Sequence, residues 1–167
     1  MVDKLREVSE ISTTPKILLL HGWFSSGNSK KYFLRSLGFD VVAPTLNDWS
    51  FRFAVKSAQQ AYDLSQPQLI VGSSRGGAVA MNIESGNTPM ILLSPAWRRF
   101  GRKKAITKRN VVLIHSMHDT MVRYADSQKL LGNSVDGVRL LTGGSDHRLN
   151  CHEGRACLKK AIELLLD

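Results

Sequence analysis

The chain has 167 residues, of which 43% are hydrophobic, and a formal net charge of +9. This length is expected to form one globular domain, residues 1–167, that buries roughly two thirds of its unfolded surface. No window approaches the ~18 consecutive apolar residues of a membrane span, and the early apolar run from Ile17 to Leu20 is too short for a signal peptide core, so we expect a cytoplasmic protein with no membrane partner.

Short runs of Ile, Val and Leu alternate along the chain with segments of helical period. The predicted strands are Ile17 to Leu20, Val41 to Ala43, Gln68 to Gly72, Met90 to Ser94, Val111 to His115 and Val138 to Leu141. Their nearly continuous apolar character is typical of strands that are buried on both faces.

The predicted helices are Ser29 to Leu37, a segment around Ala54 to Tyr62, Ser74 to about Glu84, Val122 to Leu131 and a final helix with Leu158 to Leu165. This alternation predicts an α/β fold, with a mainly parallel sheet of about six strands and helices on both faces. The polar first fourteen residues are expected to be loosely held.

The third predicted strand runs directly into the pattern Gly-x-Ser-x-Gly, which is followed by a predicted helix. This is the context of a nucleophile elbow, where the central residue has a strained backbone and projects above the sheet. The flanking residues must be small to avoid a collision of strand and helix, and three glycines meet this requirement: Gly72, Gly76 and Gly77. We therefore predict that Ser74 is a nucleophile, aided by the dipole of the helix that begins there.

A serine hydroxyl needs a base to take its proton and a carboxylate to orient that base. Asp119 follows the predicted strand Val111 to His115, and His147 follows the next strand, Val138 to Leu141. Open α/β sheets place their sites at the carboxyl ends of the strands. The sequence therefore predicts a catalytic triad of Ser74, Asp119 and His147.

Other residues compete for these roles. Ser73 is interpreted as structural because it should point away from the site, and Asp146 as a loop residue that caps backbone amides. His118 is the main alternative base because it adjoins Asp119. His115 ends a buried strand and is interpreted as a core histidine, and His152 as the start of the last helix.

An oxyanion hole requires two backbone N–H donors. We expect these from Arg75, which follows the nucleophile, and from Trp23, in the loop after the first strand. The other substrate-binding positions expected in this loop are His21, Gly22 and Phe24, with His21 holding the loop rather than acting in catalysis.

The sequence predicts no metal and no organic cofactor. The cysteines Cys151 and Cys157 are read as reduced thiols, and together with His147 and His152 they match no familiar zinc spacing. Seven of the positive charges fall in one segment without acids: Arg98, Arg99, Arg102, Lys103, Lys104, Lys108 and Arg109. We interpret this basic cluster as a solvated connection in preference to a binding patch for an acidic partner.

With these motifs assembled, the sequence resembles the α/β-hydrolase superfamily, and most closely its small bacterial serine esterases with an H-G-x-x-S-S loop. Four motifs carry the resemblance and span most of the chain: His21 to Ser26, Gly72 to Gly77, Asp119 to Val122 and Gly143 to His147. The superfamily usually has eight strands and often a helical cap, whereas this chain has room for about six strands. The basic segment from Pro95 to Lys108 stands where a cap would be inserted, so an open site is expected. Arg75 is a second departure, because an apolar residue or Gln is more usual there.

The resemblance implies a carboxylesterase that cleaves a small ester through an acyl-enzyme. One alternative is a thioesterase, in which the segment from Arg98 to Arg109 would bind the phosphates of the substrate. The other is a non-catalytic binding module whose basic surface holds nucleic acid or another acidic partner. The intact triad favours an enzyme over the binding module. The sequence leaves the natural substrate and the oligomeric state open.

Overall fold

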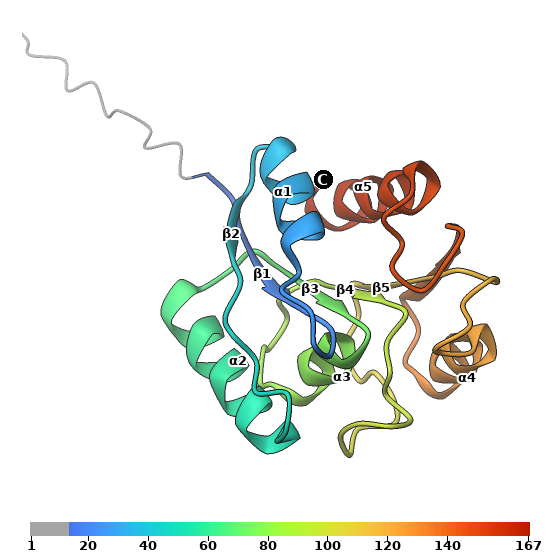
Figure 1. Cartoon of the computed structure of the whole chain (residues 1–167), viewed down its shortest axis with the longest axis horizontal. Helices are drawn as coiled ribbons and strands as arrows, with labels where there is room; N and C mark the ends of the chain where they lie inside the picture. Colours follow the sequence, from blue (N-terminus) through green and yellow to red (C-terminus); the bar gives the residue numbers. More distant parts are fainter. Residues whose placement is uncertain (1–13) are drawn as a thin grey trace, which may run out of the picture.

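Six parallel strands form the centre of the structure, a computed structural model that describes residues 14–167 (Figure 1). The strands are β1 (Lys16–Leu20), β2 (Asp40–Val42), β3 (Leu69–Ser73), β4 (Met90–Leu93), β5 (Val111–His115) and β6 (Val138–Thr142). Each predicted strand is confirmed to within one residue at either end. The expectation of a loosely held N-terminal segment concerns residues that, apart from Thr14, lie outside the described part of the chain.

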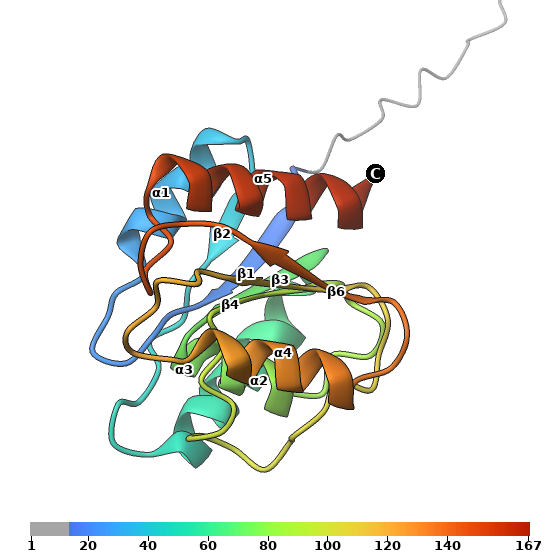
Figure 2. The ribbon, with the colours of Figure 1, turned by 90° about the vertical axis from the view of Figure 1, so that its right-hand side faces the viewer.

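Five helices cover the two faces of the sheet, as predicted. They are α1 (Asn28–Ser36), α2 (Phe51–Ser65), α3 (Arg75–Asn82), α4 (Tyr124–Asn133) and α5 (His152–Leu166). Figure 2 shows α1 and α5 on one face, and α2, α3 and α4 on the other. Each face has its own apolar cluster, with Leu34 and Leu158 in one and Ala58, Val79 and Leu130 in the other.

The expectation that all strands are buried on both faces is wrong for the two outer strands. The central strands β3, β4 and β5 are almost completely buried, whereas β2 and β6 have exposed and half-buried residues. In β6, for example, Arg139 and Thr142 are exposed. The reason is their place in the order β2-β1-β3-β4-β5-β6, because an outer strand has a neighbour on one side only.

The order of the strands creates a crevice at one end of the sheet. From β1 the chain crosses to β2 on one side, and then returns to β3 on the other side of β1. At such a switch point the loops after the two strands diverge, and open α/β sheets bind their ligands in the crevice between them. Here those loops begin at His21 and at Ser74.

The connection between β4 and β5, residues 94–110, contains turns and bends but no helix, so no cap covers the crevice. None of the helices within residues 14–167 has the length and apolar character required to cross a membrane.

Candidate active site

Ser74 has the strained backbone that the sequence predicts. Its φ is 55° and its ψ is −117°, a region that non-glycine residues rarely occupy. Hydrogen bonds from both sides hold this conformation: the Ser74 amide donates to the Leu93 carbonyl at 2.8 Å, and the Ser74 carbonyl accepts from the amides of Gly77 at 3.0 Å and Ala96 at 2.9 Å. The turn therefore fixes Ser74 between the end of β3 and the start of α3.

The glycines around Ser74 are required by close packing. A Cβ atom on Gly76 would overlap the carbonyl oxygen of Leu20, and one on Gly72 would lie 2.7 Å from the carbonyl oxygen of Gly76. A Cβ atom on Gly77 would lie 2.9 Å from Cβ of Pro95. This confirms that small residues allow α3 to start directly against β1 and β3.

The three predicted triad residues form a continuous hydrogen-bonded chain. Nε2 of His147 lies 2.9 Å from the Ser74 hydroxyl oxygen, and Nδ1 of His147 lies 2.6 Å from Oδ2 of Asp119. A carboxylate only accepts, so the ring proton is on Nδ1 and Nε2 is free to accept the serine proton. In this tautomer His147 can act as a general base toward Ser74.

Asp119 is held as a charged group although its side chain is buried. Oδ1 accepts hydrogen bonds from the amides of Met121 at 2.8 Å and Val122 at 2.9 Å, and Oδ2 accepts from His147. Burial alone would raise the pKa of Asp119. The hydrogen bonds from Val122, His147 and Met121 outweigh burial and bring the pKa below its usual value.

His115 is buried and hydrogen-bonded, as expected of a core histidine, but sequence reasoning missed that it contacts the predicted triad. Its Nε2 lies 3.0 Å from Oδ2 of Asp119 and 3.0 Å from the Val122 carbonyl, while Nδ1 lies 2.7 Å from the Ser127 hydroxyl. Both neighbours of Nε2 are acceptors, so the proton is on Nε2 and Nδ1 accepts from Ser127. Asp119 is thus bound by two imidazoles.

Of the competing residues, Ser73 was expected to point away from the site, but it is among the residues that line the cavity beside Ser74. The other competing residues have other roles. His118 is exposed, and the carboxylate of its neighbour Asp119 is engaged by His147 and His115. Oδ1 of Asp146 accepts from two backbone amides in its own loop, as predicted. His152 is the first residue of α5, also as predicted.

Two free backbone donors are available near Ser74: the Trp23 amide in the loop after β1 and the Arg75 amide at the start of α3. Within residues 14–167, neither the Trp23 amide nor the Arg75 amide donates a hydrogen bond. The amide of Phe24 is occupied, because it donates to Oδ1 of Asp48 at 3.0 Å. Trp23 is fixed by its indole N–H, which donates to the Asp48 carbonyl at 2.9 Å. These contacts leave the two amides that the sequence predicts for an oxyanion hole available to a ligand.

His21 does not take the substrate-binding position expected of it. Its buried ring accepts from the Leu46 amide at 3.3 Å through Nε2, and Nδ1 donates to the Gly22 carbonyl at 2.8 Å. The ring therefore ties the loop after β1 to the loop after β2, and it does not line the cavity, whereas Gly22 and Phe24 do.

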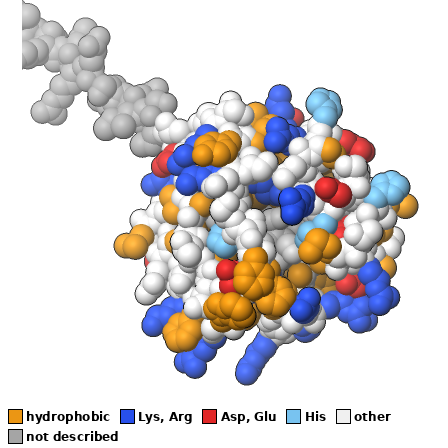
Figure 3. Space-filling view, viewed as in Figure 1, with side chains coloured by type: hydrophobic (Ala, Val, Ile, Leu, Met, Phe, Trp, Pro, Cys, Tyr) orange, Lys and Arg blue, Asp and Glu red, His pale blue; other side chains and the backbone are white. Residues whose placement is uncertain are grey.

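A cavity of about 620 Å³ opens beside Ser74 and His147. Its apolar wall includes Trp23, Phe24 and Phe100, with stacked rings of Trp23 and Phe24 5.2 Å apart. Figure 3 shows hydrophobic side chains gathered on the lower half of this face, with lysine and arginine side chains nearby. Trp97, by contrast, is buried and lies outside the cavity.

The Arg75 side chain turns into the protein, away from water. Nη2 donates to the Asn47 carbonyl at 2.6 Å, and the guanidinium lies 5.7 Å from the ring of Phe51 and 5.5 Å from that of Phe100. Within the described part of the chain, Nε and Nη1 are buried without a hydrogen-bond partner. Burial lowers the pKa of Arg75, and the nearby charge of Asp48 opposes this.

No protein-family model matches the sequence, and no curated protein matches it. Solved structures do match the fold. Alpha/beta hydrolase domain-containing protein 10 from mouse superposes with a TM-score of 0.75 at 17% identity, covering 93% of this chain and 90% of that one. An esterase from Exiguobacterium antarcticum has a TM-score of 0.73 at 10% identity, with 93% of each chain covered. Est1E from Butyrivibrio proteoclasticus has a TM-score of 0.70 at 16% identity, covering 92% of this chain and 88% of that one.

Proposed function

We propose that this chain, which has the α/β-hydrolase fold without a cap, is a serine hydrolase that cleaves small carboxylic esters. The observation that carries the proposal is the hydrogen-bonded chain from the Ser74 hydroxyl through His147 to the buried carboxylate of Asp119. A strained serine at the start of a helix, next to two free amides, supports the same chemistry.

In the proposed reaction, Nε2 of His147 takes the proton of Ser74 as the serine oxygen bonds to the ester carbonyl carbon. The amides of Trp23 and Arg75 donate to the oxyanion that forms. His147 then gives its proton to the alcohol oxygen, the carbon–oxygen bond breaks, and an acyl-serine remains. Water, deprotonated by His147, attacks this ester and releases the acid, which restores the Ser74 hydroxyl. Asp119 keeps the ring tautomer and stabilises the charged imidazole in both halves of the reaction.

The cavity supports a small substrate with an apolar part. Its volume of about 620 Å³ lies in the range of ordinary small-molecule sites, and its aromatic wall can pack against an aryl or acyl group. Among the structures with this fold, one is an esterase and Est1E has been solved with ferulic acid bound. Both names agree with an ester or carboxylic acid ligand.

The test is hydrolysis of p-nitrophenyl acetate together with labelling by a fluorophosphonate probe. Ser74→Ala is expected to abolish both, because it removes the hydroxyl that forms the acyl bond. Ser73→Ala provides a matched control at the preceding residue and is expected to retain labelling. Persistent labelling of Ser74→Ala at the wild-type rate would contradict the proposal.

A further inference from the structure

The cations of the basic cluster, residues 98–109, make different kinds of contact. Lys103 pairs with Glu84 at 3.6 Å. The ammonium of Lys104 donates to the Trp97 carbonyl at 2.8 Å, and that of Lys108 donates to the Ser85 hydroxyl and the Thr88 carbonyl, each at 2.7 Å. These lysines hold the connection between β4 and β5 against the body of the protein. Lys103 and Lys104 remain exposed, as expected of a solvated connection.

The first two residues of the cluster, Arg98 and Arg99, line the cavity beside Ser74 instead. Other segments bring further cations to the same cavity, so that its lining contains Lys30, Arg75, Arg98, Arg99, Arg123 and Arg148. The only acid in the lining is Asp126, and it is already paired with Arg98 at 3.0 Å. The cavity thus concentrates positive charge next to the predicted nucleophile.

Arg99 lies against the aromatic wall of the cavity. Its guanidinium lies 4.9 Å from the centre of the Trp23 ring and 5.5 Å from that of Phe100. These stacked contacts hold the guanidinium against the aromatic wall of the cavity. Within residues 14–167 Arg99 has no ion-pair partner, so its donors are free for a ligand.

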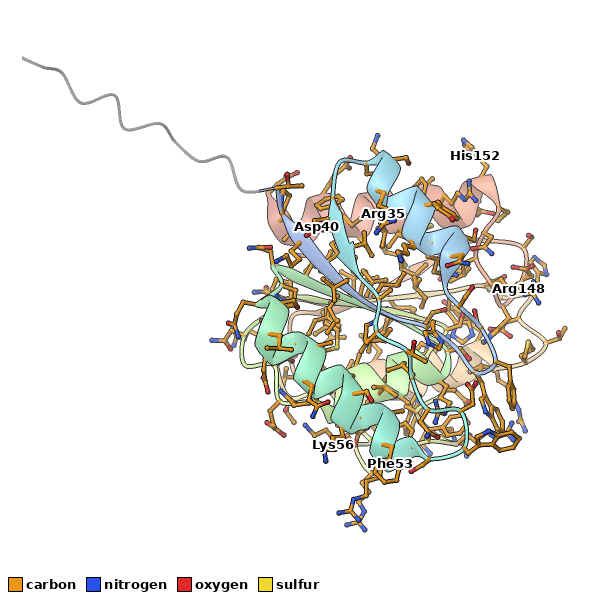
Figure 4. All side chains as sticks on the ribbon, turned by 60° about the vertical axis from the view of Figure 1, so that its left-hand side comes forward. Arg35, Asp40, Phe53, Lys56, Arg148 and His152 are labelled. Carbon is orange, nitrogen blue, oxygen red and sulfur yellow. The ribbon has the colours of Figure 1, made fainter. Side chains whose placement is uncertain are left out.

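Lys30 and Arg148 contribute two further cations to the lining of the cavity. The ammonium of Lys30 donates to the Arg148 carbonyl and lies 3.3 Å from Oδ1 of Asn150. Figure 4 shows Arg148 on the loop between β6 and α5, near the start of α1. Burial lowers the pKa of Lys30 to about 8; the charge of Asp146 opposes this, and those of Arg148 and Arg155 add to it.

We propose that this cavity selects esters that carry a negative charge, with a carboxylate or phosphate of the substrate bound by Arg99 and assisted by Arg98 and Arg123. Arginine offers forked N–H donors that match the oxygens of both groups. A recess lined by one sign of charge also attracts an oppositely charged ligand. The cavity volume fits a small molecule rather than a polymer. The inference rests on the proposed function, because it names the substrate class of that same site.

The first test compares two esters of similar length, p-nitrophenyl hexanoate and mono-p-nitrophenyl adipate, which carries a carboxylate at the far end of its acyl part. Wild-type kcat/KM is expected to be about tenfold higher for the anionic ester, the effect of one charge-assisted hydrogen bond. Adipate and inorganic phosphate are then compared as inhibitors of p-nitrophenyl acetate hydrolysis; competitive inhibition by either supports the anion site and shows which anion it prefers, whereas inhibition by neither counts against it. Added salt is expected to raise KM for the anionic ester only.

Arg99→Gln is expected to reduce the preference for the anionic ester about tenfold, through KM. The matched control is Arg102→Gln, which removes the same charge from an exposed residue of the same segment that lies outside the cavity. This variant is expected to keep the wild-type preference. An equal effect of both variants, or no preference in the wild type, would overturn the proposal.

Binding of monomethyl succinate, measured by calorimetry on Ser74→Ala with and without Arg99→Gln so that the ligand is not turned over, separates this inference from the proposed function. Binding that weakens with Arg99→Gln, when the wild type hydrolyses no ester, would support the anion site and refute the hydrolase. Hydrolysis of neutral esters by the wild type without any binding of this anion would support the hydrolase and refute the anion site.

Discussion

The contact between His115 and Asp119 predicts that a second imidazole positions the acid of the triad. His115→Met removes the N–H donor and keeps an apolar side chain of similar length in the buried site. Oδ2 of Asp119 then loses its 3.0 Å hydrogen bond and keeps the 2.6 Å bond to His147, while both amide bonds to Oδ1 remain.

The expected magnitude follows from this partial loss. A hydrogen bond to a charged group contributes about 1.5 kcal/mol or slightly more, which corresponds to about a tenfold change in rate. Three of the four donors to Asp119 persist, so we expect kcat to fall about tenfold with KM unchanged. The assay is steady-state hydrolysis of p-nitrophenyl acetate, with thermal unfolding as the control for folding.

Two further variants test whether the expected loss of kcat in His115→Met comes from the lost hydrogen bond to Asp119. His115→Gln keeps an amide donor that can reach Asp119, and it is expected to recover most of the lost kcat. Ser127→Ala removes the donor to Nδ1 of His115 but leaves the Nε2 contact with Asp119, so kcat is expected to stay close to wild type. If folded His115→Met has wild-type kcat, or if Gln gives no recovery, the second imidazole has no positioning role.

Three other predictions follow from the described contacts. Asp119→Asn is expected to lower kcat by about 10⁴, because the amide favours the wrong imidazole tautomer; the measurement is steady-state kinetics, and a loss below tenfold would argue against a triad. Gly76→Ala is expected to destabilise the protein by about 2 kcal/mol or more, because the added Cβ would overlap a backbone carbonyl. Gly132→Ala lies in an open part of α4 and is expected to stabilise the protein by about 0.5–1 kcal/mol. Chemical denaturation measures both changes. Burial brings the pKa of Lys30 to about 8, so its positive charge is present below that pH and lost above it. KM for an anionic ester is therefore expected to rise between about pH 7 and 9 in wild type, but not in Lys30→Met.

The strands and the elbow were predictable because their signals are local. Each strand contains a run of apolar residues, although Arg139 interrupts that of β6, and the glycines around Ser74 are required by contacts within the turn, with Leu20 of β1 and with Pro95 after β4. The order of Ser74, Asp119 and His147 after three strands was enough to bring them to one edge of a parallel sheet. The exposure of residues in the outer strands could not be predicted from the sequence, because it depends on the order of the strands in space.

Other features of the site depend on contacts between distant segments and could not be predicted. A histidine at the end of a buried strand gives no sign of which group it faces, so the bond from His115 to Asp119 was missed. The gathering of cations around the cavity could not be predicted for a similar reason. Lys30, Arg123 and Arg148 lie far apart in the sequence, whereas the conspicuous basic cluster of residues 98–109 contributes only its first two cations to the cavity.

The uncovered crevice has a consequence for how this protein could change during evolution. Within residues 14–167 no inserted cap has to move before a ligand enters or leaves the crevice, so the proposed turnover need not wait for such a movement. Selectivity then depends on the fixed loops around the entrance, whose side chains can be exchanged without disturbing the sheet that carries the reacting groups. Substitutions at positions such as Phe24 or Arg123 are thus the simplest route by which this scaffold could acquire a new substrate.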